Sequence, residues 1–286
     1  MKLAITILTI ALTAVSALGQ SQPATPTFKI VTDDPSLPSE LYYGNIKVKP
    51  LRVRPGTNKR ITIDDNDFFI QQHFIDFLSR LPDATSFTER LNALKNCAPG
   101  NTSCDRIAAS QSFFNSDEFQ GRGLLVYKLF MTSYARKPNY KEFLLYVRQI
   151  TPYQTAQQLE ASKVAFVNNW LTKSAFKVRY DQLSPAAYVD ALCAAAKVTV
   201  ANRNTLISDL QAGRKTRAQV LRAIAESTEV NNRYYNEAYV VMGYFGYYRR
   251  NPDNKALQLI NQLNTTHDYR ATTNSFLSSP SYRSRF

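Results

Sequence analysis

A short pattern of aromatic, basic and proline residues occurs both early and late in this chain. The late copy, Tyr244 to Asp253, reads YFGYYRRNPD, and the early copy, Phe74 to Asp83, reads FIDFLSRLPD. Aligning Pro82 with Pro252 also superimposes an arginine two positions earlier and an aspartate one position later. A recurring module of this size restricts the fold, because one unit buries too little surface alone and has to pack on its neighbours.

The proline of each copy predicts a structural turn at the end of a helix. A proline pushes the preceding residue out of the helical region of backbone space, so a helix is expected to end before it. The arginine and the aspartate of the turn are expected to pair and to tie the turn to the helix end. The predicted turn residues are Arg80, Pro82, Asp83, Arg136, Pro138, Arg250, Pro252 and Asp253.

Four copies of the module can be traced after Ile63, each roughly 50 residues long with two or three helices. The third copy is the most degenerate, since Lys197-Val198-Thr199 replaces its arginine–proline turn. We therefore predict an all-α fold in which repeated helical units pack into one bundle-like body. The predicted repeats span residues 64–122, 123–180, 181–233 and 234–286.

The first residues have the pattern of a secretory signal peptide. Lys2 precedes an apolar run from Leu3 to Val15, and Ala17-Leu18-Gly19 supplies the small residues of a signal peptidase site. The apolar run is shorter than the ~20 residues that a membrane-spanning helix needs. We expect residues 1–19 to be removed and the mature protein, without a membrane span, to be secreted or periplasmic.

Residues 20–63 are expected to form a linker and an extended arm that lies on the helical body. Prolines are frequent there, and short stretches such as Ile46-Lys47-Val48-Lys49 alternate apolar and polar residues. Such alternation permits short strands with one apolar face, but so few residues are not expected to make an independent sheet.

The segment Asp64-Asp65-Asn66-Asp67 is expected to begin the first strong helix. Side-chain oxygens at a helix start accept free backbone N–H groups, and negative charge suits the positive end of the helix. An acidic cluster is also a candidate calcium site, but the glycine and the closing glutamate of the calcium loop are absent. Helix capping is the interpretation that the sequence favours.

Three cysteines occur in the chain, and two of them are close in sequence. Cys97 and Cys104 flank a loop of turn-forming residues, so an oxidising compartment predicts a disulfide between them. Neither histidine has ligand spacing to these thiols, so no metal site is predicted. Cys193 lies in a run of small apolar residues and is expected to be a buried hydrophobe.

The formal net charge of the chain is +13 at pH 7. A strong positive charge favours acidic partners through long-range attraction. Outside the cytoplasm, acidic glycans, anionic envelope polymers or an acidic protein are better candidates than nucleic acid. The basic residues are spread along the chain without a polybasic block, which also fits ordinary solvated helix faces.

The sequence contains no recognisable catalytic group and no cofactor motif. A serine hydrolase would need one of only two histidines. His73 has Asp76 three residues on, a spacing that helix geometry alone makes adjacent, and His267 lies in a polar segment. A glycine-rich phosphate loop is absent. A pair of glycosidase carboxylates leaves no sequence trace, so an unrecognised hydrolase stays the least favoured alternative.

Aromatic and basic residues near the start of the last copy form the candidate binding site. Seven tyrosine or phenylalanine residues between positions 234 and 248 cover more of a helix than one core stripe requires, so some are expected at the surface. Tyrosine and arginine together make adaptable contact surfaces. Tyr239 and Phe245 are expected in the core. The candidate binding residues are Tyr235, Tyr244, Tyr247, Tyr248, Arg249 and Arg250.

The repeated pattern resembles a known bacterial family, the domain of unknown function numbered 4214, which occurs in secreted and surface-layer proteins. An arginine-x-proline-aspartate turn and a phenylalanine-x-serine-x-glutamate-phenylalanine close carry the resemblance. The residues are Phe74, Phe77, Leu78, Arg80, Pro82, Asp83, Phe114, Ser116, Glu118 and Phe119. The resemblance implies an all-helical fold, distantly similar to the linker domains of phycobilisomes, and it implies no catalytic residues.

These observations predict a secreted, non-enzymatic helical repeat protein that is a structural or interaction module at the bacterial cell envelope. Its expected partner is an envelope component or a protein, which it contacts through the basic, tyrosine-rich face. The alternative is a binder of acidic glycan through the same face.

Overall fold

The computed structural model describes residues 28–31, 40–48, 59, 61–150 and 155–286. The predicted signal peptide, residues 1–19, lies outside the described residues, and so does much of the predicted linker and arm, residues 20–63. Both stay predictions.

Three short strands precede the helices. They are β1 (Phe28–Val31), β2 (Glu40–Tyr43) and β3 (Ile46–Val48). The strands form an antiparallel sheet in the order β1-β2-β3, with Tyr43 opposite both Phe28 and Ile46. Gly44 follows β2 with a φ of 60°, the left-handed conformation that a two-residue hairpin turn needs. The alternating residues therefore pair in a small sheet despite their low number.

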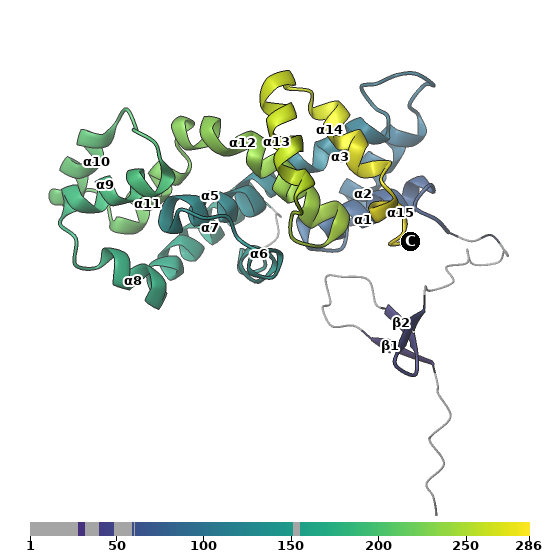
Figure 1. Cartoon of the computed structure of the whole chain (residues 1–286), viewed down its shortest axis with the longest axis horizontal. Helices are drawn as coiled ribbons and strands as arrows, with labels where there is room; N and C mark the ends of the chain where they lie inside the picture. Colours follow the sequence, from purple (N-terminus) through teal and green to yellow (C-terminus); the bar gives the residue numbers. More distant parts are fainter. Residues whose placement is uncertain (1–27, 32–39, 49–58, 60, 151–154) are drawn as a thin grey trace, which may run out of the picture.

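Helices dominate the remaining described chain, which confirms the all-α prediction for the body (Figure 1). The first of them are α1 (Asn66–Leu78), α2 (Ala84–Lys95), α3 (Arg106–Phe114), α4 (Asp117–Phe119), the π-helical segment η1 (Gln120–Leu124), α5 (Leu125–Tyr134), α6 (Tyr140–Val147), α7 (Ala156–Leu171) and α8 (Ser174–Tyr180). They are followed by α9 (Pro185–Ala196), α10 (Arg203–Gln211), α11 (Arg217–Ala225), α12 (Thr228–Gly243), the π-helical segment η2 (Tyr244–Tyr248), α13 (Lys255–Thr266), α14 (Tyr269–Leu277) and α15 (Pro280–Arg283).

The first helices of the body pack beside the last ones. α1 contacts α3 and η2, and α3 contacts α14. In the same way α5 contacts α9 and α11, and α7 contacts α11. Figure 1 shows the result: α1–α3, α14 and α15 occupy one end of an elongated body, and α8–α11 occupy the other. The helices α5 and α12 pack on each other between the two ends.

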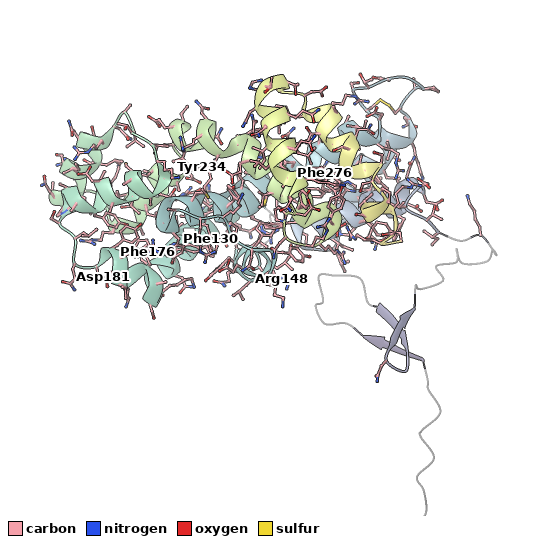
Figure 2. The ribbon with its side chains drawn as sticks, in the orientation of Figure 1. Phe130, Arg148, Phe176, Asp181, Tyr234 and Phe276 are labelled. Carbon is pink, nitrogen blue, oxygen red and sulfur yellow. A yellow bond between two sulfur atoms is a disulfide. The ribbon has the colours of Figure 1, made fainter. Side chains whose placement is uncertain are left out.

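Aromatic side chains fill the core along the whole body. Phe130, Tyr234 and Phe276, which Figure 2 labels in different parts of the molecule, are all buried. Trp170 is completely buried, and its indole N–H donates to Ser133 Oγ at 3.0 Å. Each large ring buries much apolar area. Aromatic packing therefore contributes to the core in both ends of the body.

Five of the described helical segments end in the same backbone conformation. α1, α5, α9, η2 and α13 are each followed by a residue other than glycine with a φ between 51° and 55°. These residues are Ser79, Ala135, Lys197, Arg249 and His267. The left-handed region costs a residue with a Cβ roughly 1–2 kcal/mol, so surrounding contacts have to hold each turn. In three of the turns a proline follows three residues later, at Pro82, Pro138 and Pro252.

Serine side chains begin three helices near the closing part of the predicted repeats. Ser116, Ser227 and Ser279 each accept a hydrogen bond from the backbone N–H three residues on, at the start of α4, α12 and α15. Asp65 begins α1 as predicted, but its carboxylate accepts from the backbone N–H of Thr62, at 2.8 Å, and not from a helix amide. The predicted side-chain cap is therefore wrong for Asp65, whereas Asp67 Oδ1 does accept from a backbone N–H in the first turn, that of Phe68 at 2.8 Å.

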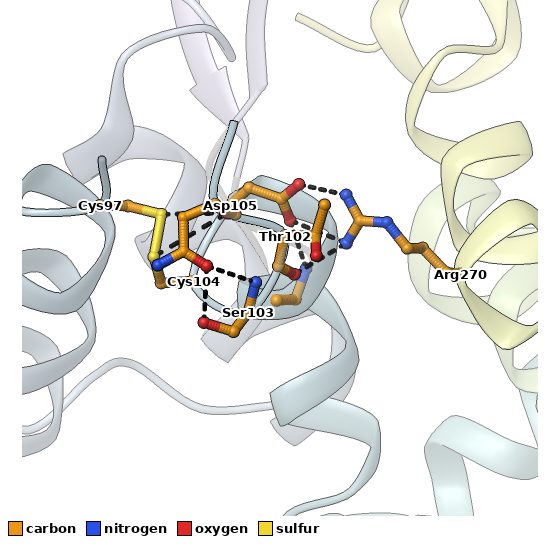
Figure 3. The surroundings of a disulfide bond; sticks show 8 residues. Cys97, Thr102, Ser103, Cys104, Asp105 and Arg270 are labelled. Carbon is orange, nitrogen blue, oxygen red and sulfur yellow. Dashed lines mark hydrogen bonds and ion pairs between the residues drawn. A yellow bond between two sulfur atoms is a disulfide. The ribbon is translucent and has the colours of Figure 1, made fainter. Parts of the chain in front are cut away.

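The predicted disulfide between Cys97 and Cys104 is confirmed, in the loop between α2 and α3 (Figure 3). Directly after it, Asp105 caps α3 and also pairs with Arg270 of α14. Arg270 donates a further hydrogen bond to the carbonyl oxygen of Thr102, inside the closed loop, at 3.0 Å (Figure 3). The disulfide loop therefore links an early pair of helices to a helix near the end of the chain.

Candidate functional site

The predicted binding stretch at η2 lies mostly in the core. Tyr244 and Tyr247 expose only 2% and 5% of their surface. The ring of Tyr247 stacks on Phe276 of α14, and the ring of Tyr244 meets the same ring edge-on. Packing against α14 thus corrects the expectation that these two tyrosines form an exposed face. Tyr239 and Phe245 are buried, as expected.

A buried chain of hydrogen bonds ends at the hydroxyl of Tyr247. Ser110 Oγ lies 2.5 Å from that hydroxyl and 2.8 Å from His73 Nε2. His73 Nδ1 lies 2.8 Å from the carbonyl oxygen of Phe69, which only accepts, so Nδ1 carries the proton and Nε2 accepts from Ser110. Burial disfavours the charged imidazolium and lowers the pKa of His73 to about 4.

The pair Ser110 and His73 has the residue types of a nucleophile and its base. Both side chains are almost fully buried, at 1% exposure each, so no substrate reaches the hydroxyl in this structure. The other ring nitrogen of His73 is held by a backbone carbonyl, and the nearby Asp76 pairs with arginines instead. Cys193 is free and buried, as predicted. These groups are therefore parts of the core.

Asp76 is a buried carboxylate that two arginines hold. Arg249 Nη2 lies 2.7 Å from Asp76 Oδ1, and Arg285 Nη2 lies 2.9 Å from the same oxygen. Burial by itself raises the pKa of Asp76, but the attraction and hydrogen bonds of both guanidinium groups outweigh it and lower the pKa. Arg285 also donates to the carbonyl oxygens of Gly246 and Tyr247. The predicted binding residue Arg249 therefore has a structural role, because it joins η2 to α1.

The other predicted binding residues are partly or fully exposed, and each has a partner within the fold. Tyr235 donates to Asn115 Oδ1 at 3.3 Å. The guanidinium of Arg250 lies 5.3 Å from the centre of the Tyr248 ring and pairs with Asp253 at 2.9 Å. Each of these contacts would have to be broken or extended before the residue served a ligand.

The predicted turn residue Arg80 pairs with Asp83 at 3.1 Å and with the buried Glu118 at 2.8 Å. Arg122 shares Glu118 at 2.9 Å and donates to the carbonyl oxygen of Leu78, the last residue of α1, at 2.6 Å. Arg80 and Arg122 therefore stabilise the end of α1 around one buried carboxylate. Arg249 and Arg285 stabilise the end of η2 around Asp76 in the same way.

A groove of about 610 Å³ lies between two of the predicted turns, the turn after α5 and the turn after η2. The backbone N–H of Tyr140 donates to Asn251 Oδ1 at 2.7 Å and so ties one turn to the other. The charged side chains that line the groove already have partners. The pairs are Arg136 with Glu142, Lys137 with Glu237 and Asp253 with Arg250. The groove therefore presents no unpaired charge to a ligand.

A second cluster of tyrosines lies at the surface, where α5 and α6 pack on α7. The rings of Tyr134 and Tyr146 have their centres 5.6 and 5.0 Å from that of Trp170. Both tyrosines are partly exposed, and neither hydroxyl has a hydrogen-bond partner among the residues that the structure describes. Burial raises the pKa of Tyr134 to about 12, so its hydroxyl stays a protonated donor at neutral pH.

Cationic side chains of α8 and its N-terminal flank lie beside these tyrosines. Arg179 lies 5.6 Å from the centre of the Tyr134 ring, and Lys173 Nζ lies 5.0 Å from that of Tyr146. Lys177 is exposed on the same helix. In the described part of the chain, Lys173, Lys177 and Arg179 form no ion pair. We call Tyr134, Tyr146, Lys173, Lys177 and Arg179 the cationic patch.

The distribution of charge along the chain favours this patch. Residues 135–180 contain eight lysine or arginine residues and two glutamates, a net charge of +6. Residues 64–122 contain five basic and nine acidic residues, a net charge of −4. A local excess of one sign attracts partners of the opposite sign more strongly than the average charge of the chain suggests. The positive excess of the chain is therefore concentrated in the segment that contains α6–α8.

The cationic patch was not predicted from the sequence because its residues come from three separate helices and their ends. Tyr134 ends α5, Tyr146 lies on α6, and the three cations belong to α8 and its start. The charge count of residues 135–180 was the available signal. The aromatic run at Tyr234 to Tyr248 was the more obvious pattern, but aromatic density alone does not distinguish a core from a surface.

Comparison of the chain with family models, with curated proteins and with solved structures found no match. The resemblance to the domain of unknown function numbered 4214 stays a prediction. Across the described ranges, no helix is long and apolar enough to cross a membrane. The same ranges hold no group of three or more His, Cys, Asp or Glu side chains placed to bind a metal ion.

Proposed function

We propose that this protein is a secreted, non-enzymatic helical repeat protein that serves as an interaction module at the cell envelope. It contacts an anionic component of the envelope through the cationic patch. The observation that carries the proposal is the set of three cations on α8 and its start beside two tyrosine hydroxyls of α5 and α6, all without an ion pair or hydrogen-bond partner for these groups among the described residues.

The repeat part of the proposal has support in the ends of the helices. Each of α4, α8, α12 and α15 is preceded by an N-cap residue, and an arginine lies six positions after that N-cap residue. The N-cap residues are Ser116, Lys173, Ser227 and Ser279. These arginines are Arg122, Arg179, Arg233 and Arg285. Each of them lies at the end of an earlier helical segment with a left-handed terminal residue, although the contacts differ. A shared position and a shared place in the fold favour copies of one unit.

The contacts of these arginines fall into two kinds. Arg122 donates directly to the last carbonyl oxygen of α1, that of Leu78, and Arg285 donates to the carbonyl oxygen of Tyr247, the residue before the last of η2. Arg179 and Arg233 lie beside a tyrosine ring, and the following tyrosine donates to a carbonyl oxygen at the helix end. Those tyrosine bonds are Tyr180 to Ser133 and Tyr234 to Ala196, at 2.7 and 2.8 Å. The first and last arginines thus share one kind of contact and the two middle ones share the other, which supports copies that differ in how they stabilise the same turn.

The non-enzymatic part rests on the burial of the candidate nucleophiles. The Ser110 hydroxyl and the Cys193 thiol both lie in the core. Burial raises the pKa of Cys193, which disfavours the thiolate that a catalytic cysteine needs. Neither residue lines the groove between the turns after α5 and η2, the pocket beside Glu160 and Lys163, or the hollow along α13.

Retention on immobilised heparin, a generic polyanion, tests the proposal. The variant K173Q/K177Q/R179Q is expected to elute at a clearly lower salt concentration than the wild type, since each cation that contacts the polymer releases counterions. The matched control K95Q/K197Q/K255Q removes the same charge from exposed positions outside the patch. Equal elution of the two variants would show that only the net charge matters and would remove the patch from the proposal.

An acidic glycan is the second candidate ligand. The hydroxyls of Tyr134 and Tyr146 favour it, because they have no hydrogen-bond partner in the described part of the chain and can donate to sugar carboxylates or hydroxyls next to the cations. Competition separates the cases: polygalacturonate is expected to displace the protein from heparin more effectively than polyphosphate of equal charge. The opposite order would exclude sugar recognition at the patch.

A further inference from the structure

Two large apolar side chains stand at the surface next to the cationic patch. Val178 exposes 88% of its surface and Leu145 exposes 60%. Val178 lies directly between Lys177 and Arg179 in the sequence of α8, and Leu145 precedes Tyr146 on α6. Exposed apolar residues are ordinary when they are scattered, but here they accompany cations that form no ion pair within the described ranges.

Helix α6 and the residue that precedes α8 meet at one edge of the body. Lys173, at the start of α8, lies over the ring of Tyr146 of α6. Figure 1 shows α6 and α8 along the same lower edge, and Figure 2 places Arg148 and Phe176, which belong to these parts of the chain, along that edge as well. On α6, Lys141 and Leu145 are four residues apart and therefore share one face of the helix.

We propose that the edge formed by α6 and α8 docks on a lipid bilayer that contains anionic lipid, with Leu145 and Val178 entering the headgroup region and the cations facing lipid phosphates. The inference rests on the proposed function, since it names the anionic component that the cationic patch contacts. Apolar side chains beside lysine and arginine are the combination that binds proteins to membrane surfaces. A hydrated polymer offers little for such apolar side chains to contact.

The aromatic rings also favour lipid over stacked sugar. Arg179 and Trp170 pack on the ring of Tyr134, and Lys173 and Trp170 pack on that of Tyr146. The ring faces are therefore largely used within the fold, and the hydroxyls and cations remain for the ligand. Phenol, ammonium and guanidinium groups all donate to phosphate oxygens, the acceptors that a lipid headgroup presents.

Sedimentation with vesicles tests the inference. The full chain is expected to sediment with vesicles of phosphatidylglycerol mixed with phosphatidylcholine, and not with vesicles of phosphatidylcholine alone. K173Q/K177Q/R179Q is expected to lower the partition coefficient by about five-fold for each cation removed. L145S/V178S is expected to lower the partition coefficient of the wild type more than L81S/L257S does. The second variant is the control, because it removes two exposed leucines elsewhere, which expose 61% and 64% of their surface.

The outcomes separate the two proposals. Retention on heparin without sedimentation on anionic vesicles, or sedimentation that L145S/V178S does not weaken, would overturn lipid docking and leave the polyanion proposal standing. Loss of both heparin retention and sedimentation with the patch variant, but not with K95Q/K197Q/K255Q, supports both. Sedimentation that neither patch variant weakens would overturn the patch itself.

Discussion

Two regions of this protein place tyrosines beside arginines, and they differ in whether a carboxylate pairs with the arginine. At η2, Tyr244 and Tyr247 are buried, and Arg249 reaches the carboxylate of Asp76. At the cationic patch, Tyr134 and Tyr146 stay partly exposed, and Arg179 lies over a ring without an ion pair in the described chain. The comparison shows that a carboxylate within reach turns a basic aromatic cluster into a part of the core.

The cost of burial explains the difference. A guanidinium group is buried only when a carboxylate and further acceptors satisfy it, because an unpaired buried charge is strongly unfavourable. Asp76 receives two arginines, and Arg285 adds backbone carbonyl acceptors. Residues 135–180 hold only two glutamates, and Glu142 already pairs with Arg136. The cations of the patch therefore have to remain in contact with solvent.

The largest effect is expected from removing the buried carboxylate of Asp76, which separates η2 from the cationic patch in this comparison. Asp76→Asn leaves Arg249 and Arg285 without their shared carboxylate and is expected to lower the free energy of unfolding by about 3–5 kcal/mol. Urea denaturation measures the change. Asp190→Asn is the matched control, because Asp190 pairs with Arg203 at the surface and its loss is expected to change stability little. Equal effects of the two substitutions would contradict a special role for the buried carboxylate.

The second prediction concerns the pH dependence of the buried hydrogen-bond chain. His73 has a pKa of about 4 when folded and an ordinary value of 6.5 when unfolded, so the unfolded chain binds the extra proton between these values. The contribution of His73 to the free energy of unfolding is therefore fully present above pH 6.5. It is lost as the pH falls towards 4, and the loss is on the order of 3 kcal/mol.

Denaturation at several pH values measures this dependence, and His73→Gln removes the titrating group. Between pH 6.5 and 4.5, where most carboxylates remain ionised, the variant is expected to show a flatter profile than the wild type. An unchanged slope would mean that His73 does not control stability in this range. A histidine NMR titration gives the pKa directly if the variant fails to fold.

The third prediction concerns the disulfide loop that meets α14. Cys97→Ser together with Cys104→Ser opens a loop with a sequence separation of 7. Loop-closure entropy predicts a loss of about 2–3 kcal/mol in the free energy of unfolding. Thermal denaturation with and without reductant measures it, and reductant is expected to affect only the wild type. A loss of stability in the double variant on reduction would contradict this assignment, because its remaining Cys193 is free.

The smallest expected effect concerns the exposed side of the comparison. K173Q/K177Q/R179Q is expected to change the free energy of unfolding by less than about 1 kcal/mol, because these cations form no ion pair with any described residue. Urea denaturation measures the change beside the heparin experiment. A loss comparable to that of Asp76→Asn would make the patch a structural element and undo the comparison.

Much of the fold follows from local patterns in the sequence. The helical body, the helix ends before Pro82, Pro138 and Pro252, and the disulfide depend on neighbouring residues, which sequence reasoning handles well. The partner of Asp76 does not, since Arg249 and Arg285 lie far along the chain. Contacts of such separation depend on how the first and last helices pack.

The degenerate third copy shows the same limit at finer scale. Residues 188–192, YVDAL, align with residues 74–78, FIDFL, and this alignment pairs Asp190 with Asp76. The left-handed residues that follow the two helices, Ser79 and Lys197, give another register. Asp190 is then about one helical turn away from the position of Asp76, and it lies at the surface with Arg203. A shift of one turn keeps the apolar pattern of a helix, so the pattern alone does not fix the register.

Hydrogen–deuterium exchange with and without a saturating polyanion tests the central claim most directly, because it reads both regions in one experiment. Added protection is predicted in peptides from Tyr134 to Tyr180, which contain α6 and α8, with little change from Tyr235 to Asp253. Protection confined to Tyr235 to Asp253 would contradict the account, since it would return the binding surface to the tyrosines that the fold buries.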